Sequence, residues 1–380
     1  MYMEHKLLEA RKGMDLFMMD IIDVTKYAIN VPKGAGAEEG FSRFLPEFLE
    51  AYTVNGSVVG FPASVDMGVL HYRKDLMKKY GFCTCGTAEC KSFGGPQGAF
   101  CDPPRTWDEL ERMARVIQDG ERPSNSDFWG LIFTAGSSED LTCRAFEFFA
   151  SHTDPSDPTM VGLDRDPVLL SNGTVVVNRR HTISALRRIG RWMGNITPRE
   201  VTTKANWQLN PLFTSGKAAF HLQWASQQFW GGTELQKQTG ISVLPGVVPG
   251  RGRGTSGGWA IATSPYTDNV NATQALATFL SGQEGQRLQW SQHGWLPTLK
   301  DLFMTGQMCA RVCPSCRNIC DLSRTNLSSY IVHRPARAAA PHYDALTRVV
   351  SSRTREVLDG LATPEEAALR MECELIEVLY

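Results

Sequence analysis

The side chains with the clearest chemical potential are cysteines, because eight of the ten fall into two clusters. The clusters are Cys83, Cys85, Cys90 and Cys101, and Cys309, Cys313, Cys316 and Cys320. Zinc sites are usually built from paired CxxC units, and only Cys313 and Cys316 have that spacing, so we favour disulfides and keep zinc as the alternative. Because disulfides persist in oxidising compartments, the clusters indicate an extracellular or secreted protein.

Five Asn-x-Ser/Thr acceptor sequences also favour a secreted glycoprotein. They lie at Asn55, Asn172, Asn195, Asn271 and Asn326. The first twenty residues, however, carry charges throughout and contain no secretory signal. This combination predicts an incomplete or mis-assigned N-terminus. The alternative is a cytoplasmic protein whose acceptor sequences are accidental.

The sequence argues against catalysis and against a bound cofactor. It contains no GxSxG, Walker or HExxH motif, and the GRGRG at 250–254 lacks the strand and helix that a dinucleotide-binding loop requires. The histidines are scattered, and each is better explained as a core or surface residue than as a catalytic one: His71, His181, His221 and His293. The CPSC at 313–316 lies outside a thioredoxin-like context, so a redox function is disfavoured.

Charge and hydropathy limit the class of partner. The formal net charge is −1 and basic residues form no stripe, which argues against nucleic acid and anionic membranes. No apolar window approaches the roughly 20 residues that cross a bilayer. A neutral small molecule is therefore the favoured partner, and a monomer is the expected state.

Two residues stand where an α/β protein places ligand-binding side chains. Asp66 lies just before the apolar strand 69–72, and Trp224 ends the strand 218–224. Ligands of open α/β sheets bind in the crevice beyond strand ends, so both side chains are candidates. Asp66 can equally be a turn former, and Trp224 can equally cap the core.

Short strands alternate with helices that carry clear start and stop signals, which predicts an α/β fold. A helix is predicted after Thr106, with Glu109 completing a capping box, and another after Thr363, with Glu366 in the same role. A helical turn is predicted from Asp75 to a left-handed stop at Gly81. Strand 218–224 is predicted to bury alternate residues, whereas GGWAIATS at 257–264 reads as a strand buried on both faces. The segments 83–102 and 304–324 read as Cys-rich inserted loops.

Five segments in order resemble the extracellular solute-binding proteins of family 1, the maltose- and trehalose-type binding components of ABC sugar importers. They are FPASVDMGVLHYRKDLMKKYGF, PPRTWDELERMARVIQ, LFTSGKAAFHLQW, GGWAIATS and HRPARAAAPHYD. The similarity extends from about Asp15 to Leu379, apart from the two Cys-rich loops. No counterpart of the family's first strand and helix precedes Met14, so we expect the first lobe to be incomplete at its N-terminus.

The resemblance implies an α/β, two-lobe, periplasmic-binding-protein-like (type II) fold with a hinge between the lobes. One lobe would comprise residues 1–64 and 255–296, and the other 65–254 and 297–380. The lobes would close over a sugar such as trehalose or maltose without chemistry. By the same resemblance, the ligand-binding residues would be Asp20, Asp66, Trp224, Gly258, Trp259 and Arg334. The implied partners are a carbohydrate and an ABC transporter membrane component.

Some residues depart from the family's pattern. Asp23 and Val24 stand where a Trp usually follows the acid matched by Asp20, and Gln223 and Ala225 flank Trp224 where the family prefers Asn and Pro. Ligand identity is therefore not transferred. The alternative function is a secreted or fused receptor-type ectodomain that keeps the fold for interaction or sensing without sugar transport.

Overall fold

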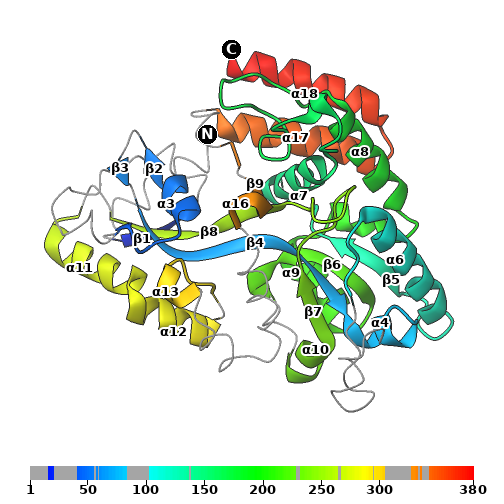
Figure 1. The fold of residues 1–380 in the computed structure, drawn as a ribbon, viewed down its shortest axis with the longest axis horizontal. Helices are drawn as coiled ribbons and strands as arrows, with labels where there is room; N and C mark the ends of the chain where they lie inside the picture. The colour runs from blue at the N-terminus through cyan, green and yellow to red at the C-terminus, as the bar shows by residue number, and fades with distance from the viewer. Residues whose placement is uncertain are drawn as a thin grey trace. The chain divides into compact units, whose positions relative to one another are not determined.

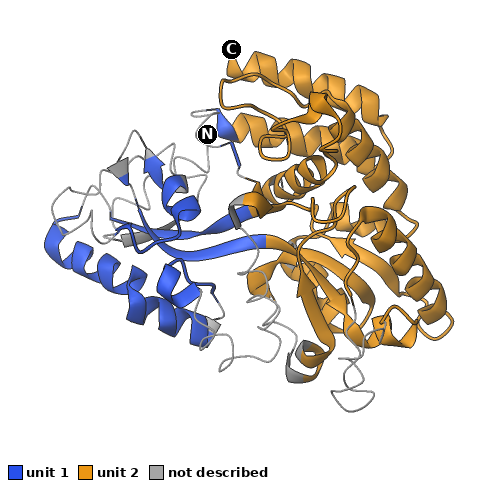
Figure 2. Ribbon diagram, viewed as in Figure 1, with its two compact units in different colours: residues 1–67, 256–328, 334–343 blue, residues 68–255, 329–333, 344–380 orange. Residues whose placement is uncertain are grey.

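The chain folds into two compact units, each of which is built from three separate stretches of the chain (Figure 2). Unit 1 comprises residues 1–67, 256–328 and 334–343, and unit 2 comprises residues 68–255, 329–333 and 344–380. The chain passes between the units inside two long strands, β4 (Phe61–Arg73) and β8 (Gly254–Thr263). The computed structural model describes residues 16–20, 41–54, 57–58, 60–83, 102–136, 138–227, 232–263, 267–293, 295–303, 327–332, 334–335 and 342–380.

Unit 1 is built on three antiparallel strands in the order β1–β8–β4. The packed helices α11 and α12 accompany them (Figure 1). The elements that lie wholly in this unit are β1 (Leu16–Asp20), α3 (Pro46–Ala51), β2 (Thr53–Val54), β3 (Ser57–Val58), α11 (Val270–Ser281), α12 (Gln283–His293) and α13 (Lys300–Phe303).

Residues 297–303 belong to unit 1, whereas the sequence assigned them to the second lobe. Buried contacts explain the difference. Leu299 and Leu302 pack against Phe44 in one apolar cluster. The buried amide of Gln286 donates to the Pro62 carbonyl (3.1 Å) and accepts from the Thr298 N–H (2.7 Å). A buried amide with satisfied donors and acceptors fixes the two backbone segments that it joins.

Unit 2 contains a sheet in the order β5–β6–β4–β7, where β5 (Trp129–Phe133) and β6 (Ala218–Trp224) are parallel. Strand β7 (Thr239–Ser242) pairs with the second half of β4, and β9 (Ile331–Val332) pairs with the start of β8. The helices are α4 (Lys74–Lys79), α6 (Trp107–Glu121), α7 (Ser138–Ser151), α8 (Arg180–Trp192), α9 (Asn206–Thr214), α10 (Gly232–Gln238), α17 (Tyr343–Leu358) and α18 (Pro364–Leu379). Short turns complete the list: α16 (Leu327–Tyr330), which straddles the unit boundary, and the 3-10 turns Pro158–Met160 and Arg199–Thr202.

Strand β6 is buried on both faces, although its sequence alternates. The residues between its apolar side chains, His221 and Gln223, are also buried. The sheet is covered on both sides, so the polar residues must find partners inside the protein. Strand β8 shows the opposite deviation, because Trp259 is 42% exposed in a segment predicted to be fully buried.

The predicted helix boundaries are confirmed where a capping box specifies them. Thr106 accepts from the Glu109 N–H (3.2 Å), and the Glu109 carboxylate accepts in return from the Thr106 N–H (3.3 Å). Thr363 and Glu366 make the same reciprocal pair at the start of α18. Each box satisfies donors that the first turn leaves unpaired.

The stop at Gly81 is also confirmed. Gly81 has a φ of 74°, and the Phe82 N–H donates to the Met77 carbonyl (2.8 Å). A left-handed residue is needed to turn the chain back onto the last carbonyls, and glycine adopts that conformation without a Cβ clash.

The cysteine predictions fall largely outside the described residues. Cys83 is described and takes part in a disulfide. Cys143, which is buried, and Cys373, which is exposed, are not in disulfides. The other seven clustered cysteines and two of the five acceptor asparagines, Asn55 and Asn326, lie outside the described ranges. The disulfide network and glycosylation therefore stay predictions.

None of the helices in the described part of the chain has both the length and the apolar character of a membrane span.

The capping box of α6 gives a test of the local folding signal. Thr106→Ala removes the side-chain acceptor of Glu109 N–H, so we expect the free energy of unfolding in urea to fall by about 1 kcal/mol. Thr106→Ser keeps the hydroxyl and should stay close to wild type. Equal stability of the alanine variant and wild type would contradict a stabilising role for the cap.

Candidate functional site

The indole of Trp224 stands at the carboxyl end of β6 on a fixed backbone. The backbone carbonyl of Trp224 accepts from His71 Nε2 (3.0 Å), and its backbone N–H donates to the Gln223 side-chain oxygen (2.8 Å). Burial lowers the pKa of His71 to about 4, so the imidazole is neutral at physiological pH. Trp224 itself is half-buried, so its backbone is anchored while part of its side chain remains open to solvent.

The buried side chain of Arg144, in α7, packs against the Trp224 indole from inside the protein. Its guanidinium carbon lies 5.2 Å from the centroid of the Trp224 ring. Nη1 of Arg144 lies 2.7 Å from Oε2 of Glu147, and both side chains are only 1% exposed. A guanidinium over an aromatic face is attracted by the ring's electrons, and the attraction is strongest where water is excluded.

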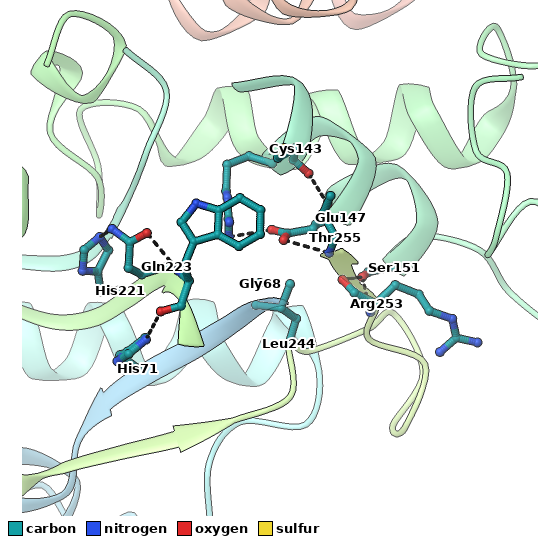
Figure 3. Close-up of polar contacts among 12 residues, drawn as sticks. Gly68, His71, Cys143, Glu147, Ser151, His221, Gln223, Leu244, Arg253 and Thr255 are labelled. Carbon is teal, nitrogen blue, oxygen red and sulfur yellow. Dashed lines mark hydrogen bonds and ion pairs between the residues drawn. The ribbon is translucent and has the colours of Figure 1, made fainter. Parts of the chain in front are cut away.

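Within unit 2, the Glu147 side chain also contacts both of the strands that run between the units (Figure 3). Its Oε1 accepts from the N–H of Thr255, the last residue of β8 in unit 2. A Cβ on Gly68, the first residue of β4 in unit 2, would lie 1.7 Å from the same oxygen. The Glu147 carboxylate therefore occupies the space that a side chain on Gly68 would need. Gly68 is also the register partner of Trp224.

Tyr330 fixes the backbone of Gly68 from another element. Its hydroxyl donates to the Gly68 carbonyl (2.5 Å) and accepts from the Leu244 N–H (3.2 Å). Burial raises the pKa of Tyr330 well above its usual value, so the phenol keeps its proton.

The charge state of Glu147 is finely balanced. Burial raises its pKa to about 7, while the Arg144 guanidinium and the Thr255 N–H act in the opposite direction. The neighbouring His71 and His221 do not add charge near neutral pH, because burial lowers the pKa of both. Glu147 is therefore the group in this cluster that changes charge near pH 7.

Unit 1 carries an acid and an indole on one face of its strand ladder. Asp66 of β4 pairs with Gly257 of β8, and Ser64 pairs with Trp259. Directly paired residues project to the same face, and so do residues two apart on one strand. Asp66 and Trp259 thus occupy one face as diagonal neighbours. Asp66 is half-buried, with one carboxylate oxygen accepting from the Met67 N–H (2.9 Å).

The remaining predicted site residues also lie in unit 1. Asp20 ends β1 opposite Trp259. Gly258 has a φ of 124°, and a Cβ there would lie 2.3 Å from the Ser64 carbonyl oxygen, so a larger residue does not fit. Arg334 is 5% exposed. The structure thus brings Asp20, Asp66, Gly258 and Trp259 onto three adjacent strands, whereas Trp224 belongs to unit 2.

Sequence analysis missed the residues that support Trp224. Arg144 and Glu147 are three residues apart in the sequence, and the residues between them and after them, as far as Ala150, are all apolar. Two opposite charges at i, i+3 in an apolar helix are the available signal, since charged residues are rarely fully buried unless paired.

Comparison with known proteins defines the class. A family model described as "Bacterial extracellular solute-binding protein" matches residues 9–308. The chain belongs to this family. The family's members bind solutes without catalysis, so the prediction that the protein is not an enzyme is confirmed.

Individual relatives align with nearly the whole length of this solute-binding protein. A probable ABC transporter-binding protein of Deinococcus radiodurans is 28% identical over 371 residues, which is 96% of this chain and 80% of the relative. Maltose-bound MalE3 of T. maritima superposes with a TM-score of 0.81 at 24% identity, covering 99% of this chain and 88% of that chain. The GacH receptor of Streptomyces glaucescens gives 0.74 at 19% identity, covering 99% and 87%. These likenesses confirm the predicted two-lobe α/β fold class.

The pH response of stability tests the environment of Glu147. Its pKa is about 7 in the folded protein and 4.5 without the fold. Between these values the folded state holds a proton that the unfolded chain has lost, so this group's contribution to stability falls as pH rises. Glu147→Gln cannot titrate and keeps an acceptor for Thr255.

We therefore expect the free energy of unfolding of Glu147→Gln, minus that of wild type, to rise by at least about 1 kcal/mol between pH 5 and pH 8. Urea denaturation at a series of pH values measures it. Buried histidines shared by both proteins cancel in the difference. A difference that does not change with pH would show that Glu147 titrates normally.

Proposed function

We propose that this solute-binding protein binds a neutral carbohydrate, an oligosaccharide such as maltose or trehalose, in a cleft between its two lobes. The observation that carries the proposal is the half-exposed Trp224 indole, held by the buried Arg144–Glu147 pair at a strand end. A sugar ring presents a C–H face that packs on an indole. A support fixed by charge and hydrogen bonds loses little conformational entropy on binding.

Residues of unit 1 supply the polar complement in this proposal. Asp66 would accept hydrogen bonds from sugar hydroxyls, and Trp259 beside it would provide further apolar contact. Asp20, Gly258 and Arg334 are proposed to line the same site, with the Arg334 guanidinium suited to paired hydroxyl oxygens. Pockets for small ligands commonly combine a few placed polar groups with aromatic walls in this way.

The known structures of the same fold support a sugar over other solutes. The T. maritima structure is described as maltose-bound, the Streptomyces GacH receptor as complexed with acarbose, and a further neighbour as a cyclo/maltodextrin-binding protein complexed with maltotetraose. Each of these titles concerns that protein. Together with the aromatic and acidic side chains named above, they favour a glucan-like ligand for this chain.

In the proposed cycle the lobes close over the sugar by bending at β4 and β8, which carry the chain between the units. A ligand stabilises the closed form only through contacts that it does not make in the open form. The closed protein would deliver its sugar outside the cytoplasm to the membrane component of an ABC importer. The Deinococcus relative, described as a probable ABC transporter-binding protein, supports that partner.

Trp224→Ala tests the proposal against a matched control. Trp129 is also half-buried and lies under a guanidinium, with Arg122 4.7 Å from its ring, but it stands at the amino end of β5. Because β5 and β6 are parallel, the two indoles lie at opposite ends of the strands of the same sheet.

We expect Trp224→Ala to weaken maltose or trehalose binding at least about 30-fold, which corresponds to about 2 kcal/mol. Trp129→Ala should change the dissociation constant less than about twofold. Isothermal titration calorimetry measures both, with thermal melting to verify folding. Failure of the wild type to bind any member of a sugar panel would refute the proposed function and favour an interaction ectodomain instead.

A further inference from the structure

A second tryptophan of unit 2, Trp207, is far more exposed than Trp224. It lies in the first turn of α9 and is 69% exposed. Single exposed apolar residues are common and need no explanation by themselves. The position of α9 relative to the sheet is what gives Trp207 significance.

The segment that leads into α9 is fixed at the carboxyl end of β5. Arg355 donates through Nη2 to the carbonyls of Ala135 (2.5 Å) and Gly136 (3.2 Å), and through Nη1 to the carbonyl of Thr202. A Cβ on Gly136 would lie 2.0 Å from the Lys204 carbonyl oxygen. The backbone just after β5 is therefore in direct contact with the residues that start α9.

The next turn of α9 is bonded to the carboxyl end of β6. The side-chain oxygen of Asn210 accepts from Gln223 (3.0 Å), and its amide nitrogen donates to Gln227 (3.0 Å). Gln223 and Gln227 stand on either side of Trp224 in the sequence. Residues at i and i+3 lie on the same face of a helix, so Trp207 shares the face of Asn210 that meets this strand end.

We propose that Trp207 is a second aromatic stacking surface beside Trp224, and that the bound sugar is an oligosaccharide of at least three rings. This inference rests on the proposed function and specifies its substrate class. Trp224 is half-buried on its guanidinium support and would hold a ring in the inner part of the site. Trp207 is solvent-facing at the same edge of the sheet and would stack on a ring further along the chain.

Two aromatic surfaces at one strand edge produce a dependence of affinity on ligand length. A disaccharide held at Trp224 gains nothing from Trp207, whereas a longer chain buries apolar C–H surface on it. Apolar burial stabilises a complex by roughly 25 cal/mol per Å², so a ring covering part of an indole is enough for a measurable effect.

The test compares wild type, Trp207→Ala and Trp224→Ala with maltose, maltotriose and maltotetraose by isothermal titration calorimetry. We expect Trp207→Ala to bind maltose within about twofold of wild type and to lose about tenfold in affinity for maltotetraose, equivalent to about 1.4 kcal/mol. Trp224→Ala should lose affinity at every length. Trp129→Ala is the control, and thermal melting confirms that each variant is folded.

Two results overturn the inference while leaving the proposed function intact. One is a Trp207→Ala variant that matches wild type at every sugar length. The other is an equal loss at every length, which would place Trp207 in the inner site with Trp224. If the wild type binds none of the three sugars, both the inference and the proposed function fail.

Discussion

The buried carboxylate of Glu147 is the constraint on which the rest of the proposed binding site depends. It accepts from Thr255 at the end of one crossing strand, fills the space left by Gly68 on the other, and holds Arg144 against the Trp224 ring. Removing two charges from water costs as much as their attraction returns, so a buried pair is weak evidence for stability. What the pair does here is fix the positions of the two side chains, because each buried partner has few alternative conformations.

Neutral polar groups complete the frame around Trp224. His71 and His221 lie on adjacent strands, and burial keeps both uncharged by lowering the pKa of each. His71 can then donate a hydrogen bond to the Trp224 carbonyl without adding charge to the core. On the other side, Gln223 continues the network to Asn210 of α9. Hydrogen bonds in a low-dielectric interior are strong, so this network couples the end of β6 to the helix that meets it.

A rigid platform suits a protein that binds and releases its ligand unchanged. A solute-binding protein needs no nucleophile or titrating acid aimed at substrate, and the buried histidines of unit 2 serve the structure instead. Preordered aromatic and acidic surfaces reduce the entropy lost on binding. Unit 1 offers its own such surface, where Asp66 and Trp259 share one face of the β4–β8 ladder. Asp66, Trp259 and Trp224, which are among the side chains proposed to meet ligand, are carried by strands.

The sequence by itself determined the features that depend on neighbouring residues. Thr106 and Thr363 start helices because their capping partners are three residues away, and Gly81 ends a helix because a left-handed residue is needed there. Ordered segments along the whole chain also identified the family and the fold class. Trp224 was recognisable as a candidate because the end of strand 218–224 can be located from a local pattern. Asp66 was predicted to precede a strand at 69–72, but β4 begins at Phe61 and Asp66 lies inside it.

Only the tertiary structure decided what packs against what. The alternation in β6 predicted one polar face, but the covered sheet buries His221 and Gln223 as well. The assignment of residues 297–303 to unit 1 follows from contacts with Phe44 and Pro62, more than 200 residues earlier in the chain. The roles of Arg144 and Glu147 likewise require Gly68 and Thr255, which approach α7 only in the folded protein. Burial and charge pairing are properties of residues distant in sequence, so no local pattern specifies them.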